Sequence, residues 1–231
     1  MNERLYDLYQ GHWNSLAEAL RPHNPVQRGL SNPLLIDLSL EYERAQPKLV
    51  IVGQQTKGWG SFGEGYGNDP VADLMAAYTD FQLGRFYRPT PFWQAAYVVH
   101  MSTDQCTASF KPFSFGWTNL VKIDERTLRP SVEIEQLVSE RFPVVREELE
   151  IARPDIVVFF TGPDYDGRLE GTFPGLRRHP AADVPEVERI SHKSLPYRSF
   201  RRYHPGHMAR RRDNIYERVM RKLIELCNAE L

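Results

Sequence analysis

"KLVIVGQQTKGWG", residues 48–60, decides the fold that we expect, because it reads as a buried strand that stops at a glycine. Every residue between Lys48 and Gly53 is apolar, which is typical of a strand covered on both faces in a parallel sheet. Gln54 and Gln55 follow at the strand end, so amides stand where an enzyme could place a carboxylate.

Three more segments read as strands of the same sheet: GWTNLVKID at 116–124, PDIVVFFTG at 154–162 and YRSFRRY at about 197–203. Helical patterns alternate with them, at about 71–83, 91–101, 131–152 with a break near Pro143, and 208–228. Strands that alternate with helices predict an α/β fold. We expect a three-layer α/β/α sandwich around a short, mainly parallel, four-stranded sheet.

The domain organisation follows from the length and from the pattern before the first strand. A chain of 231 residues is enough for one large α/β domain. LYDLYQGHWNSLAEAL, at 5–20, reads as an amphipathic helix, and a linker rich in proline and asparagine comes after it. We therefore expect residues 1–44 to pack as a helix and linker on an α/β domain of residues 45–231.

The composition, with 41% apolar and 26% charged residues, is that of an ordinary globular protein. No apolar run reaches the ~18–20 residues of a membrane span, and the N-terminus lacks the layout of a secretory signal. We expect a cytoplasmic protein that contacts no membrane, and a monomer. Two distant cysteines, Cys106 and Cys227, cannot form a zinc ribbon or a four-thiolate cluster.

Positive charge is concentrated in one segment, although the net charge is only −1. Residues 198–222 hold nine Lys or Arg against two acidic residues. One interpretation is a directed contact with phosphates. The alternative is a solvated helix face whose arginines pair with acidic residues elsewhere.

Ligands of parallel α/β sheets bind beyond the carboxyl ends of the strands, so the residues there matter most. Two phosphate-binding motifs fail at the first strand. Gly53 to Gly58 lacks the lysine and hydroxyl residue of a P-loop, and the GxGxxG at 58–63 starts too far past the strand. The last strand end, YHPGHMARRR at 203–212, places a histidine at a strand tip beside an arginine triplet. Such a histidine can donate a hydrogen bond to an oxygen that gains negative charge, unless it is merely structural.

Four segments together resemble the uracil-DNA glycosylase superfamily: VGQQTKG (52–58), WTNLVKID (117–124), RPDIVVFFTG (153–162) and YHPGHMARR (203–211). Each is short, and the resemblance lies in their order and spacing over about residues 45–228. It implies the α/β/α sandwich of that family and hydrolysis of an N-glycosidic bond without a metal or organic cofactor. The implied partner is nucleic acid, DNA rather than RNA.

The resemblance also implies residue roles. Asn119 and Gln54 would bind the edge of a flipped base, His204 would stabilise the departing base, and an aromatic ring from the glycine loop would stack on it. We expect Phe62 to be that ring, ahead of Trp59 and Tyr66. The alternative is that the aromatic residue of the loop only packs against the core. The expected contacts with the nucleic-acid backbone are Met208, Arg210, Arg211 and Arg212.

The sequence departs from the family at the position of its catalytic acid, where Gln55 stands. An amide can orient water but can neither accept a proton nor supply a negative charge. Asp124, Asp164 and Asp166 are alternative sources of a carboxylate near strand ends. Gly206, in place of a serine, removes one phosphate contact.

Three functions therefore remain open. The first is a glycosylase-like hydrolase that acts on a deaminated base. The second is an inactive protein on the same scaffold that binds nucleic acid or a nucleobase. The third is an unrelated α/β hydrolase acting on a nucleotide or another small molecule.

Overall fold

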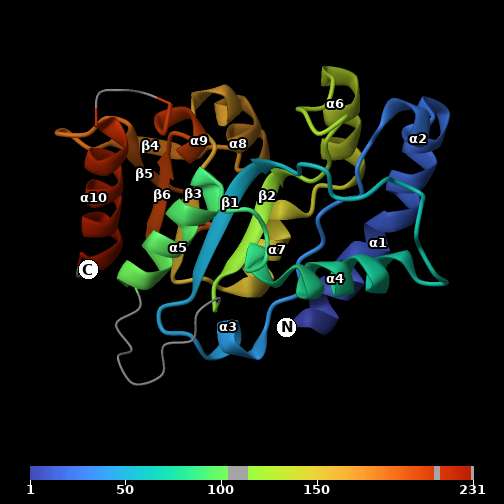
Figure 1. Ribbon diagram of the computed structural model, residues 1–231, viewed down its shortest axis with the longest axis horizontal. Helices are drawn as coiled ribbons and strands as arrows, with labels where there is room; N and C mark the ends of the chain where they lie inside the picture. The colour runs from blue at the N-terminus through green and yellow to red at the C-terminus, as the bar shows by residue number, and fades with distance from the viewer. Residues whose placement is uncertain (104–113, 211–213, 230–231) are drawn as a thin grey trace.

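Four parallel strands form the centre of the computed structural model, which describes residues 1–103, 114–210 and 214–229 (Figure 1). They lie in the order β2-β1-β3-β6, with bounds Gly116–Val121, Leu49–Gln55, Ile156–Phe159 and Arg198–Arg202. Each of these strands falls in a segment that the sequence predicts, but β1 continues through Gly53 to Gln55 and does not stop at the glycine. Their shared direction brings all four carboxyl ends to one edge of the sheet, which we call the carboxyl edge.

The described residues form a sheet of six strands, so the expected count of four is wrong. Two antiparallel strands, β5 (Val187–Ser191) and β4 (Arg177–Pro180), extend it beyond β6. Their sequences, VERIS and RRHP, contain no continuous apolar run. β4 is an edge strand with mostly exposed side chains, and in the inner strand β5 charged residues lie between the apolar ones. The pattern that reveals a buried parallel strand is therefore missing from both.

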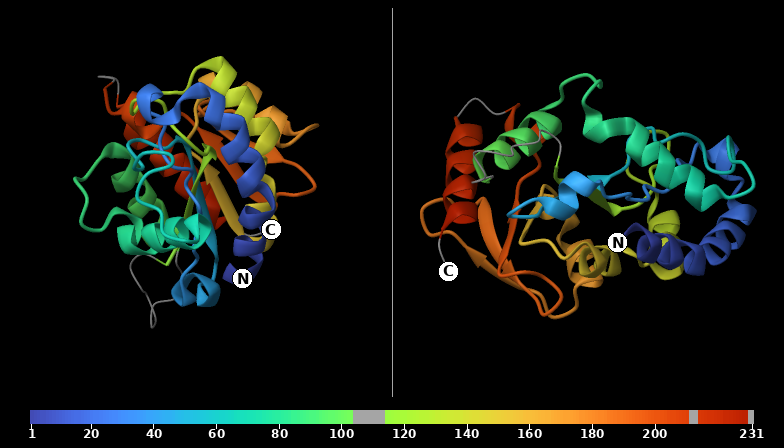
Figure 2. Two further views of the ribbon diagram at one scale, coloured as in Figure 1. Left: turned by 90° about the vertical axis from the view of Figure 1, so that its right-hand side faces the viewer. Right: turned by 90° about the horizontal axis from the view of Figure 1, so that it is seen from below.

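Helices cover both faces of the sheet (Figure 2). One face carries α4 (Pro70–Phe81), α5 (Pro91–Thr103), α9 (Pro205–Met208) and α10 (Ile215–Asn228); the other carries α6 (Val132–Arg141), α7 (Val145–Ala152) and α8 (Asp166–Thr172). The interruption near Pro143 falls between α6 and α7, as predicted. The helix expected over 208–228 begins only at Ile215.

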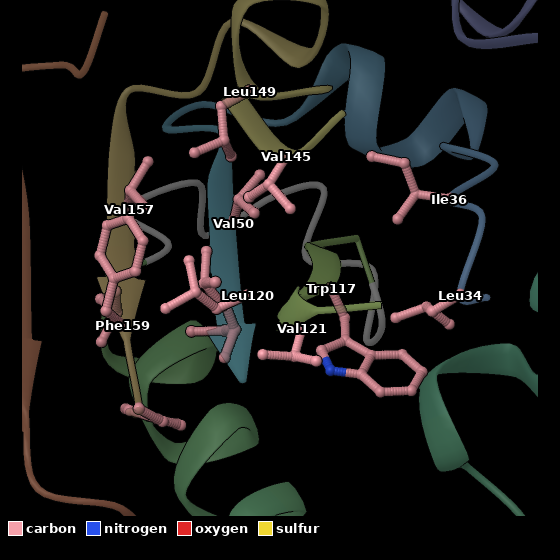
Figure 3. Close-up of a cluster of buried hydrophobic side chains, with 14 of the residues drawn as sticks. Leu34, Ile36, Val50, Trp117, Leu120, Val121, Val145, Leu149, Val157 and Phe159 are labelled. Carbon is pink, nitrogen blue, oxygen red and sulfur yellow. The ribbon is translucent and has the colours of Figure 1, made fainter. Parts of the chain in front are cut away.

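The hydrophobic core lies on both sides of the sheet. On the α7 face, Val50, Leu120 and Val157 pack towards Val145 and Leu149 (Figure 3). Because neighbouring residues of a strand point to opposite faces, the residues next to Leu120 in β2 point the other way, towards α4 and α5.

The N-terminal helix α1 (Asn2–Leu20) packs against α4, α6 and α7. It buries Leu5, Tyr9, Trp13, Leu16 and Leu20. The smaller elements are η1 (Arg21–His23), α2 (Pro25–Arg28), α3 (Leu40–Arg44), η2 (Gln82–Gly84) and η3 (Pro163–Tyr165). Among the helices of the described ranges, none has the length and apolar character that crossing a membrane requires.

Candidate functional site

The site is organised around Gly53, near the carboxyl end of β1. Gly53 pairs with Asn119 of β2 in the parallel register, so both residues face α5. A Cβ atom on Gly53 would lie 2.3 Å from the Asn119 Oδ1 and 3.3 Å from the Phe92 ring. The missing side chain of Gly53 is therefore what lets the Asn119 amide and the Phe92 ring lie over β1.

Asn119 holds an unused hydrogen-bond donor. Its side chain is only 2% exposed, and its Nδ2 has no hydrogen-bond partner among the described residues. The Thr161 Oγ1, just past the end of β3, is also buried without a partner in the described part of the chain. Buried polar groups are rarely left unpaired, so these two atoms are able to hydrogen-bond a bound molecule or a water.

His204 caps the short helix α9, and its Nδ1 accepts a hydrogen bond of 3.1 Å from the backbone N–H of Gly206. A neutral imidazole whose Nδ1 accepts carries its proton on Nε2. Burial and the nearby positive charges of Arg202, Arg210 and Lys57 lower the pKa of His204 to about 4. At neutral pH the ring is therefore an uncharged donor in a positive environment.

Phe92, at the start of α5, is the aromatic ring of this site. Its ring is stacked on His204 at a centroid distance of 6.0 Å and meets Phe160 edge-on at 5.7 Å. Phe92 and His204 are both only partly buried, so the pair reaches the surface. Phe92 thus lies beside both Gly53 and His204.

Phe62, the ring predicted for this role, lies elsewhere. It is 5% exposed and stacks on Trp13 of α1 at 5.8 Å, with Tyr66 edge-on beside it. Its backbone N–H bonds to the carbonyl of Leu30, which holds the glycine loop against the N-terminal region. For Phe62, the packing-anchor interpretation describes its place in the structure.

Gln54 and Gln55 sit at the end of β1, both partly buried. The Gln54 Nε2 donates to the carbonyl of Thr161 at 2.7 Å. The Gln55 Oε1 accepts a hydrogen bond from the hydroxyl of Tyr165. This contact leaves the Gln55 amide nitrogen, Nε2, to bind other groups. Gln55 is therefore oriented as a donor, and it cannot act as a base.

The acidic residues that could replace a catalytic carboxylate either have hydrogen-bond or ion-pair partners or lie on the surface. Asp124 accepts from the backbone N–H groups of Gly58 and Thr127 and so closes two loops. Asp166 pairs with Arg178 and with Arg201 at 2.5 and 2.7 Å. Asp164 lies on the surface of the η3 turn.

Met208 is not available for insertion into a duplex, because it is fully buried. The single turn of α9 points it inward, where its sulfur lies 3.8 Å from the Arg202 Nη2. Arg210 is exposed, as a backbone contact requires. Arg211 and Arg212 lie outside the described residues.

The basic segment 198–222 is not one charged face. Arg201 and Arg202 are buried, the first paired with Asp166 and Glu188 and the second over the Phe160 ring at 5.0 Å. Lys222 pairs with Asp183 and Glu225. Of the segment's described residues, only a few remain for an outside partner, and the phosphate interpretation is restricted to those.

The structure thus brings together Gln54, Gln55, Asn119 and His204, which come from three strand ends. It adds Phe92, Thr161 and Tyr165, which the sequence reasoning missed. A half-buried aromatic ring, an amide donor and a neutral imidazole N–H can together hold a flat, polar ring. A hollow of about 440 Å³ between α6, α7 and α8 is lined by other residues and lies on the opposite face of the sheet.

The sequence of the chain matches no protein-family model and no curated protein.

Proposed function

We propose that the carboxyl edge binds a nucleobase within a nucleic acid and that the protein hydrolyses its N-glycosidic bond, like a uracil-DNA glycosylase. The single observation that carries this proposal is the Asn119 Nδ2, which has no partner among the described residues, on a side chain that lies over Gly53 close to the Phe92 ring. That ring in turn stacks on His204. A base stacked against Phe92 would bring its edge towards the Asn119 amide, which can both donate and accept.

His204 suits the demands of the bond cleavage. When the bond between the sugar C1′ and the base nitrogen breaks, the electron pair goes to the base, and a base oxygen gains negative charge. The Nε2–H of a neutral His204 can donate to that oxygen, and the surrounding positive charges favour the anion. Water adds to C1′ and loses its proton to solvent, since Gln55 cannot accept it.

Two exposed side chains near His204 are the proposed phosphate contacts. Lys57 follows β1 and Arg210 follows α9, and both are close enough to act on the His204 charge. Contacts of this kind fix the register of the nucleic acid without reading its sequence.

A second candidate function is binding of the base without hydrolysis. The hydrogen bond from Tyr165 to Gln55 favours it, because it fixes an amide donor where a hydrolase needs a base. In that case the same residues bind, and the N-glycosidic bond stays intact.

The test is base release from a labelled single-stranded oligonucleotide that contains uracil, hypoxanthine or xanthine, followed by alkaline strand cleavage. If the proposal holds, the wild type cleaves one of them, His204→Ala lowers the rate about 100-fold or more, and Asn119→Ala weakens binding as well. Matched controls are the exposed His179→Ala and Asn68→Ala, which should behave as the wild type.

Binding is measured separately, by the intrinsic fluorescence of the tryptophans. Trp93 and Trp117 contact the Phe92 ring, so a base bound there changes their emission. A fluorescence change without strand cleavage identifies the second candidate. Neither cleavage nor a fluorescence change with any base contradicts both.

A further inference from the structure

The segment between α4 and α5 projects from the molecule (Figure 2). It carries two exposed aromatic rings. Phe86 is 80% exposed and Tyr87 is 55% exposed, in the sequence RFYRPT at 85–90. Adjacent exposed aromatic rings form an apolar surface, and apolar surfaces of this kind are often used to bind a partner.

The projecting segment itself carries positive charge. The sequence contains no acidic residue between Asp80 and Asp104, whereas the projecting segment carries Arg85 and Arg88. The Arg85 guanidinium lies over the Phe86 ring at 5.2 Å. An aromatic ring beside arginines is the combination with which proteins hold unpaired bases and their phosphates.

The projecting segment leads directly into the candidate site. Phe92 follows Phe86 by six residues, and a chain of that length spans at most about 20 Å. The Thr90 hydroxyl and carbonyl accept from the backbone N–H groups of Trp93 and Gln94, which fixes the entry into α5. Tyr87 packs on Phe81 at 5.9 Å and anchors the inner part of the segment. Phe86, at the tip, is the ring left for a partner.

We propose that Phe86 stacks on an unpaired base that flanks the base bound at Asn119, while Arg88 contacts a neighbouring phosphate. The partner is a single strand of nucleic acid that runs from the carboxyl edge across the projecting segment. This inference rests on the proposed function, because it places the neighbours of the same bound base.

The chain offers a matched control for the aromatic–arginine pair. Tyr197 is 62% exposed and has Arg189 over its ring at 4.9 Å. It comes just before the first residue of β6, at the opposite end of the strand from His204. An effect of surface aromatic loss in general would appear equally at Tyr197 and at Phe86.

The experiment measures the affinity of the full chain for a fluorescent single-stranded 15-mer with one central uracil, by anisotropy. The variants are Phe86→Ala, Phe86→Leu, Phe86→Trp and Tyr197→Ala. We expect Phe86→Ala to weaken binding about tenfold and Phe86→Leu nearly as much, because leucine is apolar but cannot stack. Phe86→Trp and Tyr197→Ala should bind as the wild type does.

A second readout follows the stacking itself. With 2-aminopurine in place of one flanking base, stacking on Phe86 quenches the fluorescence of the probe, and Phe86→Ala restores it. Equal affinities and equal quenching for wild type and Phe86→Ala would overturn the inference, and base release or tryptophan fluorescence would still test the proposed function by itself.

The remaining outcomes separate the two proposals. Binding of free uracil without binding of the 15-mer would overturn the stacking at Phe86 and leave a nucleobase site. Binding of neither would overturn both. If Tyr197→Ala weakened binding of the 15-mer as much as Phe86→Leu did, the inference would also be overturned. The loss of affinity would then not be specific to the projecting segment.

Discussion

Gly53 is the residue on which the geometry of the candidate site depends most. Its lack of a side chain leaves the space that the Asn119 amide and the Phe92 ring occupy. The close approach of a side chain and a ring to a strand backbone is a common reason for glycine in a strand.

Gly53→Ala should therefore destabilise the protein by about 2 kcal/mol, because the new Cβ forces the Asn119 side chain or the Phe92 ring to move. It should also abolish the change in tryptophan fluorescence on addition of the base. Urea unfolding and fluorescence titration measure the two effects.

The control is Gly11→Ala in the exposed interior of α1, where a Cβ meets nothing within 4 Å. Alanine favours a helix over glycine by about 1 kcal/mol, so this variant should be more stable than the wild type. A Gly53→Ala variant as stable as Gly11→Ala would contradict the packing described for the site.

His204 makes a second residue-scale prediction, about pH. The folded protein holds the pKa of His204 at about 4, below the ~6.5 of an unfolded histidine. Between these values the unfolded chain binds more protons, so the free energy of unfolding falls as the pH drops from about 6.5 to about 4.

His204→Gln removes this contribution, which is on the order of 3 kcal/mol at about pH 4. Urea unfolding between pH 4 and 7 should therefore show a smaller acid loss for His204→Gln than for the wild type. The exposed His179→Gln serves as the control. Parallel pH curves for wild type and His204→Gln would disprove the lowered pKa.

The sequence predicts some residues of the candidate site and not others, for a physical reason. Asn119 and His204 follow from the rule that carboxyl ends of parallel strands share one edge. Phe92 does not, because residues 59–97 contain ten aromatic residues and nothing in the pattern says which ring turns to the strand ends. The predicted contact of Met208 with nucleic acid is not supported, because the short helix α9 turns the Met208 side chain into the core. The sequence does not show the direction of so short a turn.

At the scale of elements, a buried ion pair joins α1, β2 and α7. The Lys122 Nζ lies 2.5 Å from the Glu148 Oε1, and both side chains are almost fully buried. Glu148 also accepts from the hydroxyls of Tyr9 and Thr118 at 2.7 and 2.8 Å. The ion pair therefore links three elements at the β2 side of the sheet.

Removing one partner leaves an uncompensated buried charge. Lys122→Met should cost about 3 kcal/mol of unfolding free energy, and Lys122→Met with Glu148→Leu should cost less, because no charge is then left buried. Arg146→Met, in an exposed pair at 3.9 Å, should change the stability by less than about 0.5 kcal/mol. Urea unfolding compares the three; a double variant less stable than Lys122→Met would contradict the argument.

The four parallel strands could be predicted because each is a run that the burial of both faces makes recognisable. The strands β4 and β5 could not, since both are short and interrupted by charged residues, and β4 is an exposed edge strand. The Lys122–Glu148 pair was also hidden, because a charged residue within a helical pattern is normally read as exposed.

At the scale of the whole molecule, the basic residues that cluster in the sequence do not form one exposed basic surface in the folded protein. Most described basic residues of segment 198–222 are buried or paired, while Lys57 and Arg210 lie exposed near His204. The number of basic residues in the segment therefore overstates how much positive charge can reach a partner.

Each phosphate contact on a single strand contributes about 0.7 to the slope of log affinity against log salt. Lys57→Gln and Arg210→Gln should each reduce that slope by about 0.7 in the oligonucleotide titration. Arg221→Gln, an exposed residue of α10, should leave it unchanged. Equal slopes for all three variants would show that the phosphates lie elsewhere.

The hydrogen bond between Tyr9 and Glu148 has a consequence for biosynthesis. It joins residues 139 positions apart, and α1 packs against α4, α6 and α7. A chain that leaves the ribosome at ~5–20 residues per second therefore holds α1 without these partners for several seconds at least. During that interval the apolar stripe of α1 is open to chaperones, and the core closes only after α7 has emerged.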